Sequence, residues 1–214
     1  MTAFPKYPAY KDSGVAWLGE VPEHWGIERS KWLFSQGKER CQPGDEQLTA
    51  SQKYGVIPQS KFVELEARRV TTVFLNPELL KRVKKGDFVI SMRSFQGGIE
   101  ASEYDGAISS AYVPLTPREG THHGFFRHLF KSARYIEALG NTSNLIRDGQ
   151  ALRFENFSMV DLPVVPFDEQ QRIASFLDEK TTQIDALIAK KQRQIELLDE
   201  QKAILINRAV TRGL

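Results

Sequence analysis

The stretch DEQQRIASFLDEKTTQIDALIAKKQRQIELLDEQKAILINRAVTRGL, from Asp168 to Leu214, decides the fold of this chain. Between Asp168 and Arg212 it has neither glycine nor proline, and it consists mainly of residues that lose little free energy on entering a helix. We expect one long helix, with Asp168 as its N-cap, Gln171 in the capping-box position and Gly213 just past its end. At about 1.5 Å per residue this helix spans roughly 60 to 65 Å, which exceeds the width of a domain of this size.

The apolar residues of this helix follow one stripe at spacings of three, four and seven, which is the seam of a helical pair. The stripe consists of Ile173, Leu177, Ile184, Leu187, Ile188, Ile195, Leu198 and Leu205. Burying these side chains even partly stabilises by on the order of 10 kcal/mol gross, so the stripe needs a partner. Lys191 interrupts the seam, and a polar residue there fixes register. We therefore favour a coiled coil. The alternative is a helix folded back onto its own domain.

Composition favours one globular body plus this helix. The chain has 214 residues, of which 41% are apolar and 26% charged. The single cysteine, Cys41, excludes an internal disulfide and a four-cysteine zinc site. No apolar run approaches the roughly 18 residues that span a bilayer, and the N-terminus has no secretory leader pattern. We expect a cytoplasmic protein without membrane contact.

The charge balance does not by itself indicate nucleic-acid binding. The whole chain has 29 Lys and Arg against 27 Asp and Glu, and eight of each lie between 168 and 214, which leaves 21 against 19 in the body. A DNA-binding surface must therefore come from the arrangement of charges on one side of the body, because their sum produces little field.

The residues before the long helix predict a mixed α/β body, so the fold class is α+β with a long C-terminal coiled-coil helix. Phe88 to Met92 and Ile108 to Leu115 are strand candidates, and apolar residues from Phe125 to Leu139 recur at helical spacing. A short helix is expected from Pro77 to Lys85, with Asn76 as its cap. Cys41 to Lys53 is expected to be a polar loop.

Two groups of polar residues are candidates for DNA contact. Arg, Asn and Gln can make paired hydrogen bonds to guanine or adenine, and these types recur in both groups. The first group consists of Arg93, Ser94, Gln96, Ser109 and Tyr112, and the second of Asn144, Arg147, Gln150 and Arg153. Each group has a simpler alternative. In the first group, the alternative is that the residues serve only to complete the hydrogen bonding of strand ends. In the second, it is that the segment is a solvated loop that closes the domain.

Signals for catalysis or a metal are weak, so we expect no catalytic residue, no metal and no cofactor. The sequence Asn76-Pro77-Glu78-Leu79 lacks the second proline and the aromatic residue of adenine methyltransferases. Glu64 with Glu66 is the nearest carboxylate pair for a nuclease metal, although one face of an exposed strand explains it equally. Adjacent histidines point to different sides of a helix, so a shared metal site is disfavoured. These histidines are His122, His123 and His128.

Several separate blocks in order resemble the specificity subunit of type I restriction-modification enzymes. The blocks are YKDSGVAWLGEVPEHW (10–25), GDFVIS (86–91), DGAISSAYVPL (105–115), LRFENF (152–157), LPVVPFDEQQRIASFLD (162–178) and IDALIAKKQRQIELL (184–198). The resemblance implies a DNA-binding target recognition domain at 1–162, followed at 163–214 by a linker and a conserved dimerisation and spacer helix. In that family the pair usually occurs twice in one subunit, and its two helices form an antiparallel coiled coil.

This chain carries one recognition domain and one helix, so the resemblance implies either the N-terminal half of a longer subunit or a natural half-subunit. When only this half is present, the resemblance implies a homodimer that pairs through the C-terminal helix. The implied partners are double-stranded DNA, the methyltransferase subunits that modify adenine and, through the complex, the restriction subunit. The implied target is bipartite and the implied role non-catalytic. Two other functions stay open: a small DNA-acting enzyme, either nuclease or methyltransferase, and a dimerising scaffold without DNA contact.

Overall fold

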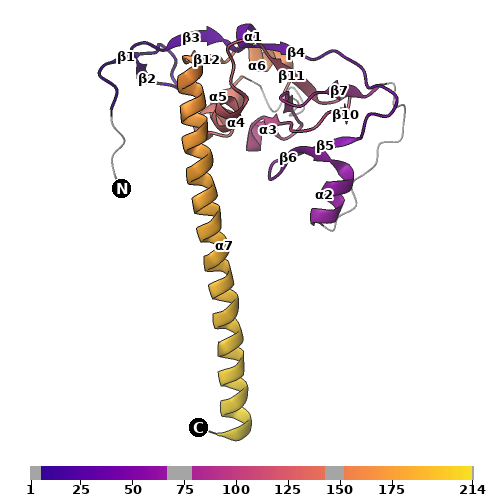
Figure 1. Ribbon diagram of the computed structural model, residues 1–214, viewed down its shortest axis with the longest axis vertical. Helices are drawn as coiled ribbons and strands as arrows, with labels where there is room; N and C mark the ends of the chain where they lie inside the picture. The colour runs from indigo at the N-terminus through magenta and orange to yellow at the C-terminus, as the bar shows by residue number, and fades with distance from the viewer. Residues whose placement is uncertain (1–5, 67–78, 143–151, 214) are drawn as a thin grey trace. The chain divides into compact units, whose positions relative to one another are not determined.

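The computed structural model describes residues 6–66, 79–142 and 152–213 (Figure 1). The chain divides into two compact units, Met1–Gln171 and Arg172–Leu214. The first unit contains short strands and helices, and the second is a single continuous helix.

The strands of the first unit are β1 (Tyr10–Asp12), β2 (Glu20–Pro22), β3 (Gly26–Arg29), β4 (Phe34–Gln36), β5 (Leu48–Ser51), β6 (Gly55–Pro58), β7 (Lys81–Val83), β8 (Phe88–Ile90), β9 (Glu100–Ala101), β10 (Gly106–Ile108), β11 (Val113–Pro117) and β12 (Asp161–Val164). Its helices are α1 (Ser30–Leu33), α2 (Gln59–Glu66), α3 (Ser94–Gly97), α4 (His123–Leu129), α5 (Ala133–Gly140) and α6 (Phe154–Ser158). The α+β class predicted from the sequence is confirmed.

The largest sheet has four antiparallel strands in the order β4-β11-β8-β9. Strand β8 lies inside it, and all three of its residues are buried, which explains its continuous apolar sequence. Four further antiparallel pairs, β1-β2, β3-β12, β5-β6 and β7-β10, complete the strand pairing of the described residues.

An aromatic cluster forms the main core between this sheet and the helices. The ring of Phe34, at the start of β4, lies 5.0 Å from Phe126, 5.4 Å from Phe130 and 5.7 Å from Phe157. The pairs with Phe126 and Phe157 are edge-to-face, and such pairs add about 0.5 to 1.5 kcal/mol each beyond the burial of apolar area. The cluster joins β4 to α4 and α6, which are far apart in sequence.

A smaller core lies beneath β5, β6, β7, β8 and β10. It consists of Leu48, Val56, Val83, Val89 and Ile108. Each of these strands contributes one buried aliphatic side chain, so the two-stranded pairs β5-β6 and β7-β10 are held against the four-stranded sheet by shared apolar burial.

Two expectations for the region before β8 are wrong. The start of the helix expected from Pro77 to Lys85, with its cap Asn76, lies outside the described residues, but the described part forms β7 over Lys81–Val83, which pairs with β10 and buries Val83 completely. This pairing and burial outweigh the local helix propensity. The polar loop expected from Cys41 to Lys53 contains β5, which buries Leu48 against the smaller core.

Turns interrupt two predicted elements. The strand expected from Ile108 to Leu115 is divided, because β10 ends at Ile108 and β11 begins at Val113. The helical segment ends near Gly140 as expected, but Phe130 to Ser132 separate α4 from α5. The hydroxyl of Ser132 caps α5 by accepting from the backbone N–H of Tyr135 at 3.4 Å.

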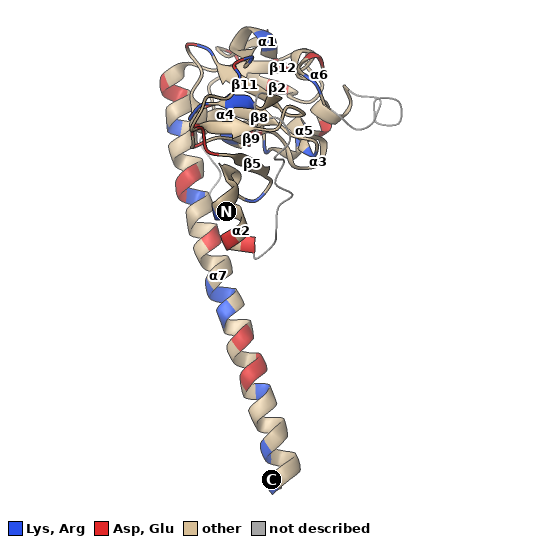
Figure 2. Cartoon of the chain, turned by 90° about the vertical axis from the view of Figure 1, so that its right-hand side faces the viewer, with Lys and Arg blue, Asp and Glu red and all other residues tan. Residues whose placement is uncertain are grey.

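The long helix α7 runs from Phe167 to Arg212, which confirms the prediction for the C-terminal stretch. Its 46 residues correspond to about 69 Å at 1.5 Å per residue. It begins directly after Pro166, so Asp168 lies inside the helix and the prediction of Asp168 as N-cap is wrong. Figure 2 shows basic and acidic residues interspersed along α7.

The first turn of α7 belongs to the first unit and is fixed there by two buried side chains. The Glu169 carboxylate accepts hydrogen bonds from Tyr7 Oη, from His24 Nε2 at 2.8 Å and from Trp25 Nε1 at 3.1 Å. The Gln170 amide donates to the carbonyl oxygens of Gly120 and Val165, both at 2.8 Å. Among the described residues, no helix is sufficiently long and apolar to cross a membrane.

Candidate nucleic-acid interface

A pocket of about 430 Å³ lies between the β5-β6 turn, helix α2 and the turn after β8. Its walls combine apolar side chains with hydrogen-bonding groups, the usual composition of a site that orients a planar ligand. The lining includes the polar side chains of Gln52, Lys53, Glu66, Arg93 and Tyr112. Two of these, Arg93 and Tyr112, belong to the first predicted group.

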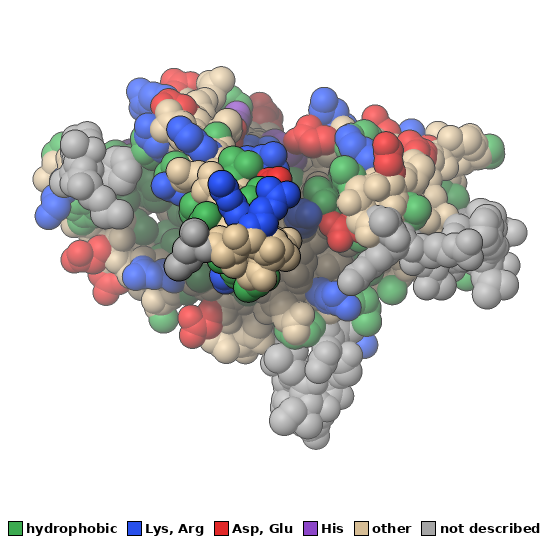
Figure 3. Space-filling model, turned by 90° about the horizontal axis from the view of Figure 1, so that it is seen from below, with side chains coloured by type: hydrophobic (Ala, Val, Ile, Leu, Met, Phe, Trp, Pro, Cys, Tyr) green, Lys and Arg blue, Asp and Glu red, His purple; other side chains and the backbone are tan. Residues whose placement is uncertain are grey.

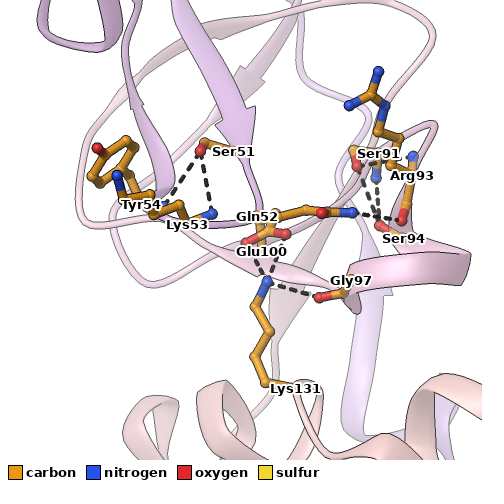
Figure 4. A network of polar contacts seen from close by, with 10 residues as sticks. All are labelled: Ser51, Gln52, Lys53, Tyr54, Ser91, Arg93, Ser94, Gly97, Glu100 and Lys131. Atoms are coloured by element: carbon orange, nitrogen blue, oxygen red, sulfur yellow. Dashed lines mark hydrogen bonds and ion pairs between the residues drawn. The ribbon is translucent and has the colours of Figure 1, made fainter. Parts of the chain in front are cut away.

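Arg93 is exposed, and a turn built on buried hydroxyl groups holds its backbone. Ser94 Oγ accepts from the Ser91 backbone N–H at 2.8 Å, and Ser91 Oγ accepts from the Arg93 backbone N–H at 3.3 Å. Figure 4 shows the guanidinium pointing away from these bonds. Within the described ranges Arg93 makes no ion pair, so its planar donor group is available to a ligand.

Ser94 itself cannot contact DNA in this structure, because it is fully buried and its hydroxyl is used inside the turn. Its inclusion among the candidate contacts is therefore corrected to a supporting role. Gln96 is exposed on α3 one turn away, so it remains a candidate.

Tyr112 reaches the pocket from the turn between β10 and β11. Its backbone N–H donates to the Ser109 carbonyl at 3.0 Å, and Lys81 Nζ donates to the Tyr112 carbonyl at 2.6 Å. Partial burial, together with the neighbouring charge of Arg40, lowers the pKa of Lys81. Ser109 Oγ accepts from the Ala111 backbone N–H at 3.3 Å, so Ser109 shapes the turn that presents Tyr112.

An ion pair between the part-exposed Lys131 and the buried Glu100 lies next to α3. Lys131 Nζ donates to both carboxylate oxygens of Glu100 at 2.6 Å and to the Gly97 carbonyl at 2.9 Å (Figure 4). Burial raises the pKa of Glu100, and the bonds from Lys131 oppose that rise. The pair joins β9 to the end of α3 and to the turn after α4.

The sequence prediction missed Gln52 and Lys53, because both lie in the segment expected to be a loop. Lys53 Nζ is 3.2 Å from Glu66 Oε1, which also accepts from Tyr54 Oη at 2.8 Å. The amide of Gln52 donates to the Arg93 carbonyl at 3.4 Å. A turn signal at Gln52 to Gly55 between two apolar pairs would have indicated the hairpin.

Only one residue of the second predicted group is described by the structure, and it does not line the pocket. Asn144, Arg147 and Gln150 lie outside the described residues. Arg153 is exposed at the start of α6, and its backbone N–H donates to Asn156 Oδ1 at 3.0 Å. Arg153 is not among the residues that line the pocket.

The histidines have structural partners. His122 caps α4 by accepting from the Phe125 backbone N–H at 3.3 Å, and the ring of His123 lies 4.9 Å from that of Phe88. Burial lowers the pKa of His123, which favours its neutral form. In the part of the chain that the structure covers, no group of three His, Cys, Asp or Glu residues could hold a metal ion.

The apolar stripe of α7 is exposed beyond residue 180. Ile184, Leu187, Ile188, Ile195, Leu198 and Leu205 are each more than half exposed. Leu197, Ile204, Ile206 and Val210, which the stripe did not include, are also exposed, so the apolar surface is wider than the predicted seam.

Charge is mixed over the face drawn in Figure 3, where basic and acidic side chains are interspersed among the described residues. This agrees with the nearly neutral composition. The overall charge therefore does not mark a nucleic-acid interface, and the candidates for one are individually placed groups such as Arg93.

Comparisons with known proteins agree with this architecture. The model of the type I restriction modification DNA specificity domain family matches residues 18–197. A crystal structure of the HsdS subunit from Thermoanaerobacter tengcongensis has a TM-score of 0.54 at 17% identity over 96% of this chain and 48% of that one. A structure from work on the assembly and conformational transition of the type I R-M system has a TM-score of 0.61 at 18% identity, over 91% of this chain and 47% of that one.

A mixed α/β domain followed by one long helix is the architecture that this chain shares with the HsdS structure. The chain belongs to the type I restriction modification DNA specificity domain family. It spans about half the length of the structural neighbours that it matches. A search of curated proteins gives no significant match.

Proposed function

We propose that this chain selects the DNA target of a type I restriction-modification complex and does not itself carry out methylation or cleavage. The observation that carries the proposal is the family match over residues 18–197, which includes the whole described pocket and most of α7. The pocket supports it chemically. Arg93 offers a planar donor group for guanine or phosphate, and Gln96 offers an amide for adenine.

The partners in this proposal are double-stranded DNA, the methyltransferase subunits and, through the assembled complex, the restriction subunit. The likeness to a structure described by the assembly of the type I R-M system supports this choice. A cytoplasmic location follows, because the proposed DNA target and partner subunits are there.

We further propose that two copies pair through α7. One copy spans about half the length of each structural neighbour, and its apolar stripe is exposed from Ile184 onward. An antiparallel helical pair would bury this stripe and relate two identical recognition domains by a twofold axis. The target would then be an inverted repeat whose halves lie about one to two helical turns apart, separated by base pairs that are not read.

Co-expression with the cognate methyltransferase subunits, followed by mapping of methylated adenines across a genome, tests the proposal. The expected product is one split, palindromic motif that disappears when this chain is omitted. Methylation that is independent of the chain would refute a role in recognition. A continuous, asymmetric motif would refute the symmetric dimer while leaving recognition intact.

Incubation of the purified chain alone with DNA, Mg²⁺ and a methyl donor provides the matching control. The DNA should be unchanged after incubation, because the proposal assigns the chemistry to partner subunits. Cleavage or methylation that copurifies with the chain at constant specific activity would contradict the non-catalytic role.

A further inference from the structure

Gln52 lines the same pocket as Arg93 and comes from the turn between β5 and β6. We propose that Gln52 is a specificity-determining residue that reads an adenine through its side-chain amide. The inference rests on the proposed function, because it names one base contact within that site. A glutamine amide can donate from Nε2 to adenine N7 and accept at Oε1 from the adenine N6 amino group, and this pair of bonds distinguishes adenine in the major groove.

The turn that carries Gln52 is held in one conformation. Ser51 Oγ accepts from the backbone N–H of Lys53 at 3.3 Å and from that of Tyr54 at 3.4 Å. Gly55 closes the turn with a φ of 73°, and a Cβ at this position would lie 2.8 Å from the Ala101 carbonyl oxygen. Such a fixed turn reduces the entropy lost when its side chain binds a ligand.

The side chain of Gln52 lies over Gly97 (Figure 4). A Cβ on Gly97 would be 2.5 Å from Cδ and Nε2 of Gln52 and 2.6 Å from its Cγ. The absence of a side chain at Gly97 therefore makes room for the amide. Lys131 in turn holds Gly97 in place by donating to its carbonyl.

The amide retains hydrogen-bonding capacity for a base. Its single bond among the described residues, from Nε2 to the Arg93 carbonyl, is long at 3.4 Å. An amide has two N–H donors and one oxygen acceptor, so one donor and the acceptor are left for a ligand. Lys53 and Glu66, which share the pocket, are instead bonded to each other.

The position of Gln52 next to Arg93 makes the pocket a two-residue reader. The backbone of Arg93 anchors the amide, while its guanidinium points away and can reach a neighbouring guanine or phosphate.

Three variants test the inference in the full chain, co-expressed with the cognate methyltransferase subunits and read by mapping methylated adenines. Gln52→Ala removes the amide, and Gln52→Glu replaces its donor by a second acceptor. Gly97→Ala leaves residue 52 unchanged but displaces its side chain. Gly97 does not have a positive φ, and the atoms that a Cβ would meet belong to a flexible side chain, so this variant should fold.

The expected result is relaxed discrimination at one adenine position in each half of the motif, about ten- to one-hundred-fold, with the other positions preserved. Gln52→Ala and Gly97→Ala should relax the same position. The control is Gln42→Ala, which alters an exposed glutamine outside the pocket and should keep the wild-type motif.

Retention of the complete wild-type motif by Gln52→Ala would overturn the inference while leaving the proposed function intact. Loss of methylation at every site by a Gln52→Ala protein that is as stable as the wild type would also overturn it, because the residue would then support DNA binding in general. If the same motif were methylated without the wild-type chain, the proposed function itself would be overturned.

Discussion

Lys131 Nζ lies 2.6 Å from each carboxylate oxygen of Glu100, and the Glu100 side chain is 1% exposed. The same ammonium group donates to the carbonyl of Gly97, beneath the candidate base-reading amide of Gln52. A buried carboxylate is tolerated because this one cation compensates it. The pair therefore links the stability of the first unit to the geometry of the pocket.

Removing the cation should destabilise the fold strongly. We expect Lys131→Met to lower the free energy of unfolding by about 3 kcal/mol, because Glu100 would remain buried without its partner. Urea denaturation measures the change. Lys85→Met, which breaks an exposed contact of 4.0 Å to Glu103, is the control and should cost less than about 1 kcal/mol. Equal losses in the two variants would contradict this account of the pair.

Glu169 should make stability depend on pH in the acid range. Burial alone would raise its pKa, but hydrogen bonds from Tyr7, His24 and Trp25 outweigh burial and lower the pKa below 4.5. The ionised carboxylate therefore stabilises the fold above pH 4.5, and this contribution is lost as the pH falls through the lowered pKa.

Glu169→Gln should reduce the free energy of unfolding by about 1 to 3 kcal/mol at pH 7, and the difference from wild type should shrink below pH 4.5. Denaturation at a series of pH values measures it. Glu155→Gln, at an exposed position on α6, should show no such trend. A difference that is constant with pH would disprove the role of the carboxylate.

Two glycines should respond in opposite ways to alanine. Gly98 has a φ of 80°, and a Cβ there would lie 2.1 Å from the Phe130 carbonyl oxygen, so Gly98→Ala should cost more than about 3 kcal/mol. Gly140 ends α5, and a Cβ there meets nothing within 4 Å in the described structure. Gly140→Ala should therefore stabilise by about 0.5 to 1 kcal/mol. Thermal unfolding of both variants provides the comparison.

The proposed dimer should depend on the apolar stripe of α7. Leu198→Asp should weaken self-association by about tenfold or more, because burying one leucine contributes about 1.5 to 3 kcal/mol. Analytical ultracentrifugation over a range of concentrations measures the effect. Glu200→Ala, which lies on the opposite helix face, should leave association unchanged. A wild-type chain that remains monomeric at high concentration would rule out this pairing.

The sequence predicted the long helix well, because its signals are local. A run without glycine or proline and with strong helix formers specifies α7 almost to the residue. With Asp168 as N-cap the helix would begin at Glu169, but it begins two residues earlier, at Phe167 directly after Pro166, so Asp168 falls inside the first turn.

The region from Cys41 to Lys85 was predicted poorly because its structure depends on contacts between residues that are far apart in the sequence. Lys81–Val83 has helix propensity, but pairing with β10 and the burial of Val83 turn it into a strand. The polar sequence around Leu48 conceals β5, whose core contacts come from distant strands. Gln52 was missed together with that hairpin.

The candidate site was predicted in part. Arg93 and Tyr112 share a pocket although 19 positions separate them, and Gln96 lies exposed nearby on α3. Ser94 proved to be buried in the turn that holds Arg93. Residue types at strand ends indicate which groups could bind DNA, but they do not indicate which way each side chain points.

The sequence by itself determined the family, the α+β class and the long helix with its apolar stripe, because ordered motifs and helical periodicity are properties of neighbouring residues. Only the tertiary structure decided that Gln52 lies over Gly97 beside Arg93 and that Lys131 compensates Glu100. Those contacts join segments 31 to 45 positions apart. They arise from packing of separate strands and helices, which no local pattern encodes.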